Sequence, residues 1–174
     1  AIEMKLMPIL SDMEMRGIYV DVEATKQLQE QFACDLTILA VILREAGIEN
    51  PRSTMQKAKL LDAQLRALAP AKMTKGGKIS VGRKQLERLT RTTLVTALLE
   101  YAEKEKLRQF CEELLRFQEN GIIHTNYNQV VTETGRLSSS KPNLQNIPVR
   151  TEQGKFLRKL FVPRPGCVFV SADM

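Results

Sequence analysis

The chain has 174 residues, of which 43% are hydrophobic and 26% charged, and its net charge is +6 at neutral pH. This composition is typical of a soluble globular protein with one ordinary or two small domains. It contains no run of about 18 apolar residues that could form a membrane-spanning helix. The first residues also lack the basic and then apolar pattern of a secretory signal. We therefore expect a protein that is not embedded in a membrane.

The cysteines and the chain ends give two further expectations. Cys34, Cys111 and Cys167 lie far apart without the spacing of a metal site, which predicts reduced thiols with packing roles. The chain starts without Met and ends at Asp173 and Met174. We expect a piece of a longer polypeptide, or a processed one.

Positive charge is concentrated in the second and third parts of the chain. Residues 1–70 have a net charge of −2, whereas residues 71–120 and residues 121–174 each have +4. Basic residues are densest over residues 72–91, where Glu87 is the single acidic residue. The basic residues there are Lys72, Lys75, Lys78, Arg83, Lys84, Arg88 and Arg91. A solvated helix face is the ordinary explanation of a charged run, but this imbalance around a Gly-Gly loop favours a polyanion such as nucleic acid.

The first part of the chain is predicted to be helical. Apolar residues on one face predict a helix over residues 2–16 that ends at Gly17. Asp21 caps the next helix, whose apolar stripe ends before Gly47. After a turn, Ser53 caps a third helix.

The middle of the chain is predicted to form a helical arm with a basic tip. Residues 72–80 contain two adjacent glycines and three lysines, which is typical of a mobile loop between helices. Ser80 is the expected cap of a short helix over residues 83–89. A long amphipathic helix follows over residues 93–118.

The pattern changes to strands in the last third of the chain. Branched or aromatic side chains alternate with polar ones over residues 122–132, as in a half-buried strand. His124 has no other His or Cys nearby, so a structural hydrogen bond is favoured over a metal or acid–base role. Residues 155–162 predict a short helix or edge strand, and residues 167–172 predict an apolar strand that ends at Asp173. A carboxylate at a strand end often holds a cation and as often serves as a turn or cap residue.

Between these strands lies TETGRLSSSKPNLQNIPVR, residues 132–150. It gathers hydroxyl and amide side chains around two arginines and two prolines. Such a segment suits neither a core helix nor a buried strand, and its chemistry is that of a loop that grips a polar partner. A purely structural loop is the alternative for each of its residues taken singly.

This loop, followed by a short basic helix, a turn and VFVSAD, resembles the segment of family A DNA polymerases (the bacterial DNA polymerase I type) that leads into their first catalytic motif. The family pattern runs T-x-T-G-R-L-S-S-x-x-P-N-L-Q-N-I-P-x-R. Upstream, GIIHTNYNQ, YAEKEKL and MEMRGIYVD are similar to further motifs of the family. The resemblance implies an α+β fold with three parts. These are an N-terminal helical segment leading into the polymerase domain at residues 1–49, a helical thumb with a basic tip at residues 50–120, and the start of an antiparallel palm at residues 121–174.

The resemblance also implies which residues bind DNA. Contacts to the duplex backbone would come from Ser53, Lys72, Lys75, Lys78, Arg83 and Lys84, and Lys106 would approach the backbone or the minor groove. Contacts to the minor groove would come from Arg136, Asn143, Gln145 and Asn146. Hydrogen-bond donors suit that groove because purine N3 and pyrimidine O2 present acceptors at similar places in every base pair. Ser138 and Ser139 would satisfy backbone groups or phosphates.

Catalytic roles are implied at the end of the chain. Asp173 matches the family's first catalytic aspartate, a ligand of both Mg²⁺ ions in two-metal nucleotidyl transfer, and the Met174 carbonyl would be a second ligand. Arg150 would lie near the incoming triphosphate. The sequence departs from the family pattern at Met174, where the pattern has Tyr, and at Ala102, where it has Arg.

The sequence contains no fingers helix and no second catalytic aspartate. One carboxylate cannot position two metal ions, so we expect a part of a DNA-directed DNA polymerase of replication or repair that is inactive alone. The expected partners are primer-template DNA, deoxynucleoside triphosphates, and a second polypeptide or C-terminal region with the fingers and the rest of the palm. The expected location is the cytoplasm of a bacterial or phage-infected cell.

Two alternatives from other functional classes remain open at this point. One is a non-catalytic clamp module that binds duplex DNA. The other is an interaction or scaffold protein whose basic arm binds an acidic protein.

Overall fold

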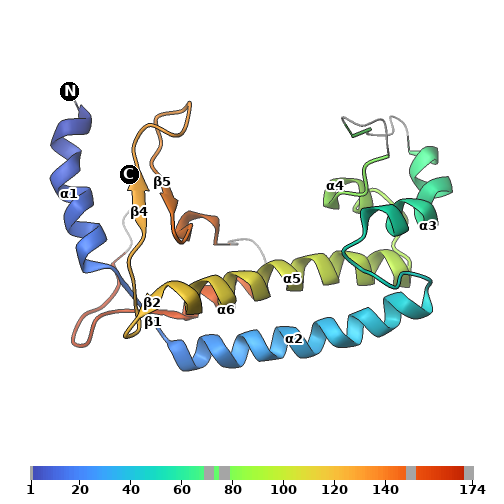
Figure 1. The fold of residues 1–174 in the computed structure, drawn as a ribbon, viewed down its shortest axis with the longest axis horizontal. Coiled ribbons are helices and arrows are strands. Elements are labelled where there is room, and N and C mark those ends of the chain that lie inside the picture. The colour runs from blue at the N-terminus through green and yellow to red at the C-terminus, as the bar shows by residue number, and fades with distance from the viewer. Residues whose placement is uncertain (1, 69–72, 75–78, 148–151, 171–174) are drawn as a thin grey trace. The chain divides into compact units, whose positions relative to one another are not determined.

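A computed structural model describes residues 2–68, 73–74, 79–147 and 152–170 (Figure 1). The chain is an α+β protein, as predicted. It forms two compact units, one of residues 1–29 with 109–174 and one of residues 30–108. None of the helices in the described ranges is long and apolar enough to cross a membrane.

The unit of residues 30–108 is built from helices around an apolar core. It contains α3 (Thr54–Ala67), the short helix α4 (Arg83–Leu86), and parts of α2 (Val22–Glu45) and α5 (Thr93–Phe117). The buried core residues are Leu39, Leu43, Ile48, Leu61, Leu65, Val81, Leu86, Leu89, Val95, Ala97, Leu98 and Leu99. Burial of a large aliphatic side chain contributes roughly 1.5–3 kcal/mol relative to exposure, so this cluster holds the unit together.

Side-chain caps start the helices at the predicted positions. The Asp21 carboxylate accepts a hydrogen bond from the Ala24 N–H at 2.9 Å at the start of α2. The Ser53 hydroxyl accepts from the Gln56 N–H at 3.3 Å at the start of α3. Each cap satisfies an N–H group that has no partner inside its helix.

Ion pairs connect α5 to other elements of the helical unit. The buried Glu105 carboxylate accepts a hydrogen bond from Arg52, in the turn before α3, and lies 3.4 Å from Arg108 Nε. Lys104 pairs with Asp35 on α2. Partly buried charges are screened less by salt than exposed ones, so these pairs help to fix the α2–α3 turn against α5.

The other unit contains α1 (Ile2–Arg16), α6 (Glu152–Lys159) and a four-stranded antiparallel sheet in the order β2-β3-β1-β6. The strands are β1 (Ile18–Val20), β2 (Gln118–Glu119), β3 (Ile122–Ile123) and β6 (Phe161–Val162). Tyr19 lies opposite Ile122 on one side and Val162 on the other. Asn120 and Gly121 have φ of 53° and 78° and form the tight turn between β2 and β3, a turn type that requires positive φ at both positions.

A second sheet is the hairpin of β4 (Asn126–Asn128) and β5 (Ser138–Ser140), which lies beside α1 (Figure 1). Glu14 of α1 holds β4 in place. Its carboxylate accepts a hydrogen bond from the Tyr127 N–H at 2.6 Å, and its carbonyl oxygen lies 2.8 Å from His124 Nδ1. The structural role predicted for His124 is confirmed. Burial, and then the nearby Glu14 carboxylate, raise the pKa of the Tyr127 phenol.

The prediction of one continuous strand over residues 122–132 is wrong. The strand is broken at His124 and Thr125 into β3 and β4, which belong to different sheets. The cause is a contact distant in sequence: the buried Thr125 hydroxyl donates a hydrogen bond to the Pro142 carbonyl oxygen at 2.7 Å.

The strand predicted over residues 167–172 is also not found in its described part. Residues 167–170 have no strand partner, and Val168 and Val170 are 80% and 86% exposed. Apolar alternation predicts a strand only where a neighbouring strand and a core are present to cover it.

Two predictions about single residues are wrong as well. Gly82, not Ser80, is the N-cap of α4, and the Ser80 hydroxyl accepts instead from the Gly82 N–H at 3.4 Å. Cys34 and Cys167 are exposed, so the packing role holds only for Cys111. Burial raises the pKa of the Cys111 thiol to about 12.

Gly17 ends α1 with φ of +60° and is expected to tolerate no side chain. A Cβ there would lie 2.6 Å from Ile122 Cγ2 and 2.7 Å from the Ile123 carbonyl oxygen. We expect Gly17→Ala to lower the free energy of unfolding by at least about 2 kcal/mol, as measured by urea denaturation. The control is Gly166→Ala, at φ of +78° with no atom within 4 Å of the added Cβ, for which strain alone predicts about 1 kcal/mol. Equal losses in the two variants would contradict this prediction.

Candidate nucleic-acid interface

The hydroxyl- and amide-rich segment forms the second strand of the β4–β5 hairpin and a turn that follows it. The cross-strand pairs are Asn126–Ser140, Tyr127–Ser139 and Asn128–Ser138. A 3-10 turn, η1 (Leu144–Asn146), comes shortly after the hairpin. The prediction of a loop is wrong for β5, which pairs with β4 through backbone hydrogen bonds, whereas the 3-10 turn η1 is compatible with an ordered loop.

Hydrogen bonds around Asn143 fix the turn. Its side-chain oxygen accepts from the Gln145 backbone N–H at 3.1 Å and from the Ser139 hydroxyl at 3.2 Å. The buried Ser139 oxygen also lies 3.3 Å from the Gln145 nitrogen, so Ser139 satisfies a backbone group, as predicted. Asn commonly caps a turn in this way. Because the Asn143 oxygen is used inside the protein, the NH₂ group is the part of the side chain left for an outside acceptor.

Further polar contacts anchor the segment between the hairpin and the turn. The Thr125 hydroxyl donates to the carbonyl oxygen of the buried Pro142 at 2.7 Å. It also lies 3.2 Å from the carbonyl oxygen of Ser140. Asn128 Nδ2 donates to the Ser140 hydroxyl at 3.1 Å. The Ser138 hydroxyl is buried and has no hydrogen-bond partner among the described residues, so it satisfies no described backbone group, and its contact with a phosphate stays a prediction.

The remaining donors of the segment face solvent. Arg136, Gln145 and Asn146 are exposed, and Asn143 is half-buried. The Thr132 hydroxyl donates to the Arg136 carbonyl oxygen at 2.5 Å, which holds the backbone while the guanidinium stays exposed. The structure therefore places Arg136 in the loop of the β4–β5 hairpin and Asn143, Gln145 and Asn146 at the turn that follows β5.

The basic residues of the helical unit differ in how far their charge is already compensated. Arg83 donates to Glu87 at 2.8 Å and to Glu103 at 3.4 Å, and the hydrogen bond to Glu87 is the largest cause that raises its pKa. Lys84 and Lys106 are exposed, and neither forms an ion pair with a described residue. Ser53 uses its hydroxyl oxygen as the cap of α3. Of these residues, Lys84 and Lys106 are the ones for which a phosphate would not have to compete with a described carboxylate or a helix cap.

Several predicted site residues lie outside the described part of the chain. They are Lys72, Lys75, Lys78, Arg150, Asp173 and Met174. The described residues contain no group of three or more His, Cys, Asp or Glu that could hold a metal ion. Metal binding by Asp173 and Met174 stays a prediction.

Three positioning residues were not singled out from the sequence. Glu14, Thr125 and Asn128 hold α1, the hairpin and the turn together through side-chain hydrogen bonds. Glu14 lies inside the MEMRG segment noted for its similarity, which was a usable signal. The partners of Thr125 and Asn128 are 12 or more residues away, and no local pattern marks them.

Comparison with known proteins gives the same family for most of the chain. The family model of DNA polymerase family A matches residues 22–174. DNA polymerase I of Chloroflexus aurantiacus is 38% identical over 182 residues, which cover 99% of this chain and 19% of the relative. The thermostable DNA polymerase I of Thermus aquaticus is 37% identical over 178 residues, covering 99% of this chain and 21% of that protein.

DNA polymerase I of Bacillus subtilis is 37% identical over 168 residues, covering 93% of this chain and 19% of the relative. This chain thus spans about a fifth of the length of these relatives.

A solved structure has a similar fold. The POL domain of Pol1 from M. smegmatis, in complex with DNA primer-template and dNTP, matches with a TM-score of 0.81 and 33% sequence identity. The match covers 94% of this chain and 30% of that one. The sequence motifs, the hairpin that carries them and both comparisons agree: the chain belongs to DNA polymerase family A.

Proposed function

We propose that this chain is the part of a DNA-directed DNA polymerase that holds the primer-template duplex and supplies one metal-binding aspartate. The observation that carries the proposal is the turn after β5. There, internal hydrogen bonds hold the Asn143 side-chain oxygen, while Gln145 and Asn146 are exposed, as is Arg136 in the hairpin loop. The related POL domain of Pol1 is described in complex with DNA primer-template and dNTP, which supports DNA and deoxynucleoside triphosphates as partners.

The donors suit a polymerase because it must hold every base pair alike. Minor-groove acceptors occupy similar positions in all four pairs, so fixed donors can contact a correct pair of any sequence. Arg136 would contact the primer end, and Asn143, Gln145 and Asn146 would contact minor-groove or sugar atoms. A turn fixed by its own hydrogen bonds loses little conformational entropy on binding, which favours affinity.

The helical unit would supply contacts that do not depend on sequence. Lys84 and Lys106, with Ser53 and the lysines at residues 72, 75 and 78, would neutralise phosphates. Contacts of this kind provide affinity and make it fall with salt. Arg83 would contribute less than the lysines, because a phosphate must compete with Glu87 and Glu103 for its guanidinium.

Catalysis would require Mg²⁺, which prefers the oxygen donors that Asp173 and the Met174 carbonyl offer. Bound Mg²⁺ would stabilise the charge that develops on the transferred phosphoryl group. Arg150 would hold the triphosphate near this site. We propose the division of roles expected from the sequence: an N-terminal segment at residues 1–49, a thumb at residues 50–120 and the start of a palm at residues 121–174.

The activity of the complete enzyme would be nucleotidyl transfer in DNA replication or repair in the cytoplasm. The fingers and the rest of the palm would come from a further region or a second polypeptide. A chain with one candidate metal-binding aspartate would not catalyse this reaction alone.

A binding and extension assay with the purified chain tests the proposal. Labelled primer-template is expected to bind, with an affinity that falls steeply as salt rises, because phosphate contacts release counterions. Primer extension with Mg²⁺ and all four deoxynucleoside triphosphates is expected to yield no product. Fluorescence anisotropy and a sequencing gel give the two readouts. Salt-independent or absent binding would contradict the DNA-binding role, and robust synthesis would contradict the dependence on further polypeptide.

The same assay distinguishes the clamp alternative. Addition of a polypeptide with the fingers and the remaining palm of a family A polymerase is expected to restore extension. A non-catalytic clamp would bind the duplex equally and stay inactive with that addition.

Single substitutions test which cations contact phosphates. Lys84→Ala and Lys106→Ala are each expected to reduce the slope of log K against log salt by about one. Arg83→Ala serves as the matched comparison and is expected to change the slope less, because its charge is shared with two carboxylates. If Arg83→Ala changed the slope as much as Lys84→Ala, the proposed competition would be wrong.

A further inference from the structure

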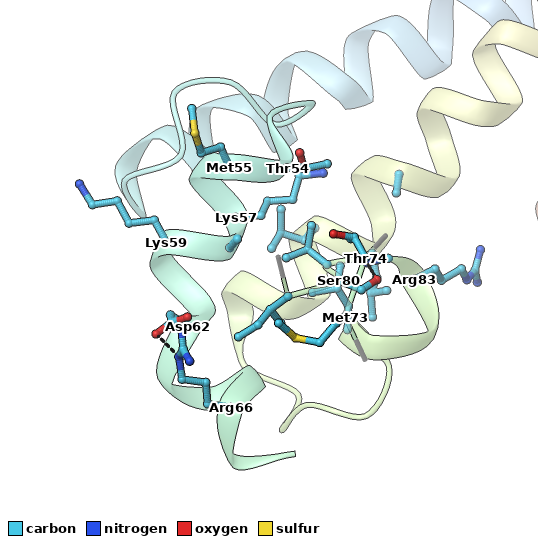
Figure 2. A pocket seen from close by; sticks show the side chains of 18 residues that line it. Thr54, Met55, Lys57, Lys59, Asp62, Arg66, Met73, Thr74, Ser80 and Arg83 are labelled. Carbon is cyan, nitrogen blue, oxygen red and sulfur yellow. Dashed lines mark hydrogen bonds and ion pairs between the residues drawn. The ribbon is translucent and has the colours of Figure 1, made fainter. Parts of the chain in front are cut away.

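The helical unit contains a pocket of about 940 Å³ that none of the proposed DNA contacts explains (Figure 2). It is lined by α3, residues 73–74, residues 79–82, α4 and α5. Its volume lies within the range of ordinary small-molecule sites, about 300–1,000 Å³. The pocket can therefore accommodate a compound of drug or metabolite size.

One wall of the pocket is apolar and belongs to the core of the unit. Val81, Leu86, Leu98 and Leu99 line it and are each less than 10% exposed. Ile79 and Ala58 are packed against the same core. Apolar groups of a ligand would be removed from water here without any rearrangement of the core.

Two lysines of α3, Lys57 and Lys59, also line the pocket. Lys57 is half-buried, and burial lowers the pKa of its ammonium group. In Figure 2 its side chain ends beside Thr54, whereas Lys59 extends away from the pocket. No described carboxylate pairs with Lys57. A partly desolvated ammonium of this kind gains from an anionic partner.

Both arginines and the carboxylate at the pocket are already paired. Arg66 donates to Asp62 at 2.7 Å, and Arg83 donates to Glu87 and Glu103. Of the two lysines that line the pocket, Lys57 is half-buried and Lys59 is exposed, so Lys57 is the better placed to select the charge of a ligand. The apolar wall and the half-buried Lys57 together define an amphiphilic site.

We propose that this pocket binds a small amphiphilic anion: an aromatic or aliphatic body against Leu98 and Leu99, with one carboxylate, sulfonate or phosphate group facing Lys57. Such a ligand is distinct from duplex DNA, which would contact the exposed lysines by its backbone. The pocket offers a separate binding site on the unit that carries Arg83 and Lys84.

Two probes of matched shape test the proposal. Anilinonaphthalene sulfonate carries an aromatic body and an anionic group, and N-phenylnaphthylamine carries a similar body without the charge. Both are expected to bind the folded chain at one site, followed by fluorescence titration. Lys57→Met is expected to lower the affinity for the sulfonate probe about tenfold, because a hydrogen bond to a charged group is lost. In the same variant, the affinity for the neutral probe is expected to change by less than about twofold.

Two further variants and one ion complete the test. Lys59→Met removes the same charge two residues away and is expected to leave both probes unaffected. Ala102→Trp, at an exposed position of α5 that lines the pocket, is expected to weaken both probes by filling the space. Inorganic sulfate alone is expected to compete only weakly, because it lacks the apolar body.

The proposal is overturned if Lys57→Met leaves sulfonate affinity unchanged, or if Lys59→Met weakens it equally. It is also overturned if both probes bind the Ala102→Trp variant with unchanged affinity. Circular dichroism of each variant establishes that the chain is folded, and methyl NMR shifts at Leu98 and Leu99 report binding in the pocket independently of fluorescence.

Discussion

The side-chain oxygen Oδ1 of Asn143 accepts hydrogen bonds from the Gln145 N–H and the Ser139 hydroxyl, and the rest of the candidate interface depends on these bonds. They use the acceptor of the side chain inside the protein and leave its donor outside. They also start the turn that exposes Gln145 and Asn146. A loop closed in this way presents donors before any DNA arrives, so little ordering entropy opposes binding.

The basic residues of the helical unit fall into two groups: some form ion pairs within the unit, and others are exposed to solvent. Arg52, Arg83 and Lys104 are engaged with carboxylates of the same unit, and these pairs fix its turns and helices. Lys84 and Lys106 remain exposed. A count of basic residues therefore overstates the charge available to a duplex. In the proposed interface, the number of phosphates contacted, and with it the salt dependence, would follow from the lysines without an ion-pair partner among the described residues.

Local sequence features predicted much of the fold because their physical causes are local. Asp21 and Ser53 cap helices within three residues, and the motifs around the hairpin identified the family before its geometry was known. Failures came from contacts distant in sequence. The predicted strand is broken where the Thr125 hydroxyl donates to the Pro142 carbonyl oxygen, 17 residues away. Likewise, no local pattern marks the second partner of Arg83, Glu103, which lies 20 residues away. The apolar pattern of residues 167–170 predicted a strand, but these residues have no neighbouring strand among the described residues.

The most direct test compares Asn143→Ser with Asn143→Ala in DNA affinity and in free energy of unfolding. Serine keeps a neutral acceptor for the turn, so stability is expected to stay within about 0.5 kcal/mol, whereas alanine is expected to cost about 1 kcal/mol. Both variants lose the outward NH₂ group and are expected to bind primer-template about fivefold more weakly. A serine variant that binds DNA as tightly as the unchanged chain would contradict the claim that Asn143 turns its oxygen inward in order to present its donor to the duplex.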